Sequence, residues 1–96
     1  MSGEVAEAIR QTRRTLAEKT WVPHQPWENT GQVCLVTSTP GAAWPTAAAR
    51  GAWAVFRVSA GVRQLAGWND QQEDVGAVLA MTLEALIAEL CRGSAS

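Results

Sequence analysis

Few residues in this chain could do chemistry, and the first to consider are the two cysteines and the single histidine. A thiolate beside an imidazole is a nucleophile, and Cys34 would reach His24 if a strand at residues 32–37 paired with residues 21–25. The sequence offers no identifiable residue to orient the histidine and no identifiable oxyanion hole. We therefore interpret Cys34 and Cys91 as free, buried thiols and expect no catalysis.

Other chemical signatures are missing from the sequence. One histidine and no Cys-x-x-Cys pair leave no zinc site, and neither glycine-rich phosphate-binding motif is present. A formal net charge of −1 argues against a dedicated nucleic-acid binder, whose only basic face here would carry Arg10, Arg13, Arg14 and Lys19. We expect no enzyme activity, no metal, no cofactor and no nucleic-acid partner.

Tryptophan is the unusual residue, since it supplies five of the six aromatic side chains. Tryptophan is enriched at interface hot spots and is useful in ligand pockets. Trp53 and Trp68 fall in helical patterns, where large rings would fill a thin core. Trp27 and Trp44 lie among prolines and are less constrained. We predict that they form a partner-binding surface together with His24, or alternatively a small-molecule pocket.

These residues must be positioned by a small fold. A chain of 96 residues with 47% hydrophobic content holds one core, so we predict a single domain over residues 1–96. Helical periodicity runs through residues 4–19, and Ser2 could cap this helix. The apolar stripe of this helix consists of Val5, Ile9, Thr12 and Leu16. Four prolines between residues 21 and 46 exclude a helix interior there, and residues 32–37 predict a short strand, paired as a hairpin with residues 21–25.

Two further helices follow this ribbon. The first is predicted from Thr46, its N-cap, to a stop at Gly67, and Gly51 and Gly61 are the points where it could kink or break. The second is predicted over residues 71–91, with Asp70 as N-cap and a glutamate three residues later completing a capping box. The expected fold is mostly α, a three-helix core with a short β-ribbon between helices 1 and 2.

The last predicted helix is apolar around most of its circumference. One stripe consists of Leu79, Leu83, Leu86 and Leu90, and a second consists of Val78, Met81, Ala85 and Ala88. The leucine stripe alone is wide enough to meet the other two helices. We therefore predict a homodimer through the second stripe, because two-fold homodimers are the commonest oligomers. The ribbon or a host protein could cover that stripe instead.

Location follows from two patterns. Residues 2–7 are acidic and polar, unlike a signal peptide, and residues 76–88 are too short to span a bilayer. We expect a cytoplasmic protein without membrane contact.

The order of parts carries a resemblance. A first helix leads to Trp21, a Val-Cys-Leu run follows at residues 33–35, and a Trp-Asn-Asp run at residues 68–70 precedes the last helix. In this order, over nearly the whole chain, the sequence resembles a family of small actinobacterial and actinophage proteins catalogued as a domain of unknown function. The chain departs from the family at residues 36–40, where members continue Gly-Ala-Leu into a helix.

The resemblance implies an actinobacterial or mycobacteriophage origin and supplies no catalytic residues. Together with the missing catalytic patterns, it leads us to expect a non-enzymatic interaction protein, such as a mycobacteriophage product that binds and modulates a host protein in the host cytoplasm. A small-molecule-binding domain is the alternative. We assign the Trp-Asn-Asp run at residues 68–70 to structure rather than to chemistry.

Overall fold

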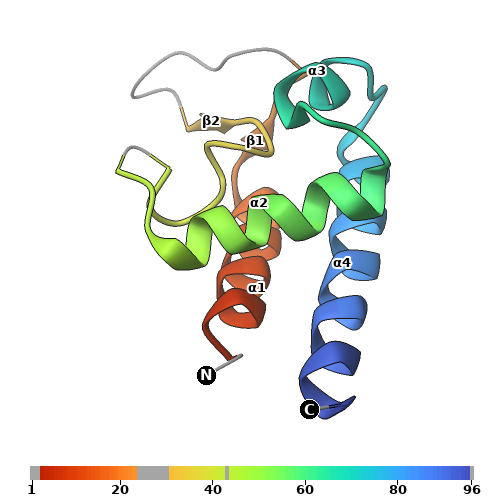
Figure 1. Ribbon diagram of the computed structural model, residues 1–96. Coiled ribbons are helices and arrows are strands. Elements are labelled where there is room, and N and C mark those ends of the chain that lie inside the picture. Colours follow the sequence, from red (N-terminus) through yellow and green to blue (C-terminus); the bar gives the residue numbers. More distant parts are fainter. Residues whose placement is uncertain (1–2, 24–30, 43, 96) are drawn as a thin grey trace.

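The computed structural model describes residues 3–23, 31–42 and 44–95 (Figure 1). Within these residues the elements are α1 (Gly3–Glu18), β1 (Thr20–Trp21), β2 (Gln32–Val33), α2 (Ala47–Ala60), α3 (Leu65–Asp70) and α4 (Val75–Ala95). In Figure 1, α1 and α4 run antiparallel and α2 lies across them. These three helices contact one another, so the predicted fold, a three-helix core with a short ribbon, is confirmed.

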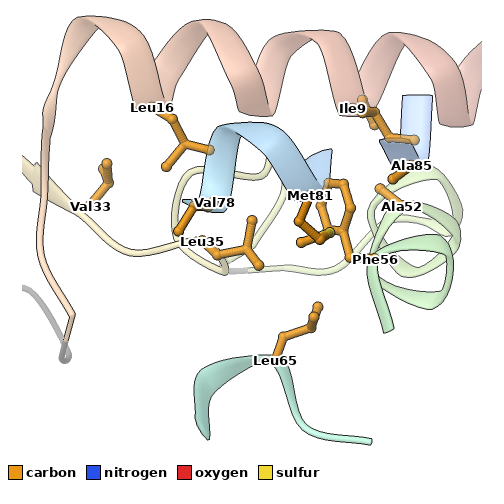
Figure 2. Close-up of a cluster of buried hydrophobic side chains, with 11 residues drawn as sticks. Ile9, Leu16, Val33, Leu35, Ala52, Phe56, Leu65, Val78, Met81 and Ala85 are labelled. Carbon is orange, nitrogen blue, oxygen red and sulfur yellow. The ribbon is translucent and has the colours of Figure 1, made fainter. Parts of the chain in front are cut away.

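The core is where the three long helices meet. Ile9 and Leu16 of α1 are buried, as the predicted stripe requires, and the hydroxyl of Thr12 donates to the carbonyl of Ala8 at 2.7 Å. Figure 2 shows side chains from all four helices and from the segment after β2 around a common centre. The buried cluster consists of Ala8, Ile9, Leu16, Val33, Leu35, Ala52, Phe56, Leu65, Val78, Met81 and Ala85. Ser2, the expected cap of α1, lies outside the described residues.

The second predicted helix is two helices. Thr46 caps α2 as expected, because its Oγ1 accepts a hydrogen bond from the amide of Ala49 at 3.1 Å. The helix then ends at Gly61, one of the two glycines where the sequence allows a break, and not at the predicted stop at Gly67. Gly61 adopts φ 70°, and its amide bonds back to the carbonyls of Arg57 and Val58. Gly67 lies inside the short helix α3 instead.

The start of the last helix also differs from the prediction. Asp70 is the final residue of α3 rather than a cap, and α4 begins at Val75. The carboxylate of Asp74 accepts the amide of Ala77 at 3.2 Å, which is the capping contact expected of Asp70. Asn69, next to Asp70 in α3, bonds through its buried amide to Trp21, Val22 and Leu35, and so attaches this short helix to the ribbon and to the turn after β2.

The ribbon is parallel, not a hairpin. Thr20 is opposite Gln32 and Trp21 is opposite Val33, so the predicted pairing direction is wrong. The second strand is also shorter than predicted, because residues 34–39 form turns. Side-chain hydroxyls there bond to the local backbone in place of a strand partner: Ser38 donates to the carbonyl of Leu35 at 2.7 Å.

The two apolar stripes of α4 exchange the roles expected of them. Val78, Met81 and Ala85 are buried inside this single chain at 0%, 5% and 0% exposure, so they cannot form the predicted self-association face. Ala88 is exposed. The small side chains at positions 78 and 85 let α1 and α2 approach α4 closely, which leucines would prevent. In the leucine stripe, Leu83 and Leu90 are exposed, whereas Leu79 and Leu86 are half-buried against the edge of the core.

Candidate functional site

The side chain of Asn69, near the end of α3, makes hydrogen bonds to three different residues. It is fully buried, and its Oδ1 accepts hydrogen bonds from the Trp21 indole at 2.7 Å and from the Leu35 amide at 3.0 Å. Its Nδ2 donates to the carbonyl of Val22 at 3.2 Å. One amide thus holds α3, the ribbon and the turn after β2 together. These contacts are structural, in line with the role assigned to the Trp-Asn-Asp run.

The cysteines offer no catalytic arrangement in the described residues. Cys34 is buried, and the hydroxyl of Thr37 lies 3.5 Å from its Sγ and accepts a hydrogen bond from its amide at 2.9 Å. His24, its imagined partner, lies outside the described residues. Cys91 is exposed, which corrects the expectation that both thiols are buried. The part of the chain that the structure describes holds no group of three or more His, Cys, Asp or Glu side chains suited to a metal ion.

The basic face expected on α1 is partly engaged within the fold. Arg13 is half-buried, and its Nε donates to the hydroxyl of Thr82 on α4 at 3.3 Å. Arg10 lies 3.7 Å from the carboxylate of Glu7, one turn earlier on the same helix. Of the four cations that a nucleic-acid-binding face would use, two therefore have partners in their own chain.

Trp44 is the most exposed large apolar side chain described, at 88%. It lines an open recess of about 550 Å³ beside the loop that precedes α2. The other lining residues are Thr15, Lys19 and residues 37–42. Trp53 and Trp68 instead pack against the core, as expected. Trp27 and His24, the other members of the predicted partner-binding surface, lie outside the described residues, so the structure places Trp44 alone.

A second apolar surface lies on the last helix. Leu83 is 42% exposed, Ile87 52% and Leu90 42%, while Leu79 and Leu86 are half-buried beside them. We call these five residues the α4 outer face. The four leucines of this surface form a stripe that is visible in the sequence, but the stripe was expected to face the other two helices. Ile87, the most exposed of the five residues, belonged to neither predicted stripe.

A third feature is a cleft where α2 crosses α4. Its volume is about 270 Å³, and it contains Glu89, a carboxylate residue only 4% exposed. The sequence alone does not reveal this cleft, because position 89 continues the spacing of the buried residues Val78, Met81 and Ala85, where an apolar side chain is expected.

Comparisons with protein families, with curated proteins and with solved structures find no match to this chain. Among the described residues, no helix combines the length and the hydrophobicity that crossing a membrane requires.

Proposed function

We propose that this protein acts by binding a protein chain through the α4 outer face, and that the bound chain is a second copy of itself. The exposure of Leu83 and Ile87 carries this proposal. Contiguous apolar patches on small proteins mark interaction surfaces more often than isolated exposed leucines do. Their neighbours along the helix, Leu79 and Leu86, extend the patch over several turns.

The spacing of the α4 outer face supports a second copy as the partner. Leu83 and Leu90 are equally far from the midpoint between Leu86 and Ile87. Two copies of α4 packed antiparallel about that midpoint would therefore set Leu83 against Leu90 of the other copy, and Leu86 against Ile87. A two-fold interface must be self-complementary in this way. The net charge of −1 adds little repulsion between copies.

Sedimentation velocity or light scattering between about 1 and 100 μM tests the proposal, since micromolar association is evident in this range. Wild type should have twice the mass of one chain, and Ile87→Glu should be a folded monomer, because it would bury an unpaired carboxylate. Ala88→Glu is the matched control: it places the same charge one residue away, about 100° around the helix, and should remain dimeric. A monomeric wild type at 100 μM, or a dimeric Ile87→Glu, would contradict the proposal.

A second candidate function is small-molecule binding at Trp44, favoured by its exposed indole. Lys19 lines the same recess, so a planar anion could stack on the ring and pair with the ammonium. A thermal-shift screen of nucleotides and metabolites should then give hits that Trp44→Ala abolishes. A screen without such hits would remove this candidate.

A host protein as partner, a mycobacteriophage origin and a cytoplasmic location stay predictions. They rest on the resemblance described above and on the residues that carry it.

A further inference from the structure

The cleft between α2 and α4 combines small apolar walls with one buried charge. Figure 1 shows the two helices crossing. The walls contributed by α2 are Gly51, Ala54, Val55, Val58 and Ser59, and α4 contributes Ala88, Glu89 and Arg92. Because four of the five α2 positions are apolar or glycine, the cleft could hold the methylene groups of a ligand next to the carboxylate.

The burial of Glu89 calls for a cationic partner. Removing a carboxylate from water is costly unless a cation or several hydrogen-bond donors satisfy it. Among the residues that line the cleft, Arg92 is the one cation, and its guanidinium contacts the Oε2 of Glu89. The two ends of this ion pair differ, since the Arg92 side chain is 70% exposed and that of Glu89 is 4% exposed. The carboxylate is thus fixed in the cleft, whereas its partner reaches it from solvent.

We propose that this cleft is a binding site for a small organic cation, a guanidinium or primary ammonium on a short aliphatic stem. In the unliganded chain the guanidinium of Arg92 pairs with the carboxylate of Glu89 in the place that the cationic group of the ligand would take. A guanidinium matches a carboxylate with two parallel hydrogen bonds, and the apolar wall around Ala54 and Val58 contacts the stem. A volume of about 270 Å³ is close to the small end of ligand pockets, which fits a stem of about four carbons.

Titration of ¹⁵N-labelled protein with butylguanidinium, followed by NMR, tests the site. In wild type the amides of Ala54, Ser59 and Ala88 should shift saturably at millimolar ligand, since a single ion pair with a short stem gives affinity of about that order. Arg92→Ala should bind butylguanidinium about two- to fivefold more tightly, because the ligand no longer competes with Arg92 for the carboxylate of Glu89. The gain is small because Arg92 is exposed to solvent and its ion pair is therefore weak. Neutral 1-pentanol at the same concentrations should leave these amides unchanged.

The Glu89→Gln variant tests whether binding depends on the negative charge of the side chain at position 89 rather than on the shape of the cleft. It keeps the size of the side chain and should weaken butylguanidinium binding at least about tenfold, the effect of losing a charged hydrogen-bond partner. Glu84→Gln, an exposed carboxylate on the same helix, is the matched control and should bind like wild type. Thermal melts of each variant establish that it is folded. If Glu89→Gln proves unfolded, the pentanol comparison in wild type and the gain in Arg92→Ala still decide the question.

Three results would overturn the site. These are wild-type binding that Glu89→Gln retains, pentanol shifts equal to those of butylguanidinium, and the absence of any shift in both wild type and Arg92→Ala. An Arg92→Ala variant that binds no more tightly than wild type would overturn the stand-in role of Arg92.

Discussion

Replacing Asn69 by alanine should be among the most damaging single changes outside the apolar core. The variant removes the Oδ1 that accepts hydrogen bonds from the Trp21 indole and the Leu35 amide. It also removes the Nδ2 that donates to the carbonyl of Val22. The free-energy cost of losing the hydrogen bond differs between the three partners, because they are buried to different degrees. Leu35 is fully buried, so its amide loses its hydrogen bond where no water can replace it. Trp21 and Val22 are half-buried, and water can reach their polar groups in part.

The magnitude follows from that difference. An orphaned buried amide costs about 1–3 kcal/mol, and each of the two partly wet bonds contributes about 0.5–1 kcal/mol. The sum is about 3 kcal/mol, a large share of the 5–15 kcal/mol that holds a typical domain together. For a chain of this size a loss of 3 kcal/mol lowers Tm by roughly 12–24 °C. Asn69→Leu, which keeps the volume, should cost at least as much, because the Leu35 amide is orphaned in both variants.

Urea denaturation followed by circular dichroism measures the loss, and the indole N–H resonance of Trp21 reports the local change by NMR. Gln72→Ala is the matched control. It also removes a side-chain amide, one that donates to the carbonyl of Trp68 at 2.8 Å near the surface, and should cost about 1 kcal/mol or less. An Asn69→Leu variant as stable as wild type, or a Trp21 indole resonance that is unchanged in Asn69→Ala, would contradict the role assigned to Asn69.

Two further predictions compare paired variants by thermal or urea denaturation. An added Cβ at Gly51 would lie 2.7 Å from the Cγ2 of Val5, whereas one at Gly67 would meet nothing within 4 Å. Gly51→Ala should therefore destabilise by about 1 kcal/mol, since overpacking outweighs the gain in helix propensity, and Gly67→Ala should stabilise by about 0.5–1 kcal/mol; equal effects would contradict the close α1–α2 contact. Asp74→Ala should cost about 1 kcal/mol by removing the cap of α4, while Asp70→Ala should change stability by less than about 0.5 kcal/mol. The reverse order would restore the capping role that the sequence suggests for Asp70.

The two proposed sites can be tested independently because they lie on different sides of α4. Ile87 of the outer face and Glu89 of the cleft are two residues apart, which separates them by about 200° around the helix. Ile87→Glu should therefore leave butylguanidinium binding unchanged. Likewise, Glu89→Gln should leave the oligomeric state unchanged.

Local patterns in the sequence determined much of the fold. The stripe of α1 is unambiguous, because its opposite face is charged and only one side can be buried. The cap at Thr46 follows from the proline before it and the alanine run after it, and both act within a few residues. Such signals need no knowledge of the rest of the chain.

The remaining decisions belong to the tertiary structure. Both stripes of α4 are apolar, so periodicity alone could not choose between them; the core took Val78 and Ala85 because small side chains allow close helix packing. The side chain of Asn69 makes hydrogen bonds across 34 and 48 positions of the chain, which no local pattern predicts. Those bonds also attach α3 to the ribbon. The parallel pairing of β1 with β2 in this ribbon is itself specified by no local turn signal. Glu89 was recognisable as a buried charge only once α2 lay across it, because burial depends on the packing of distant segments.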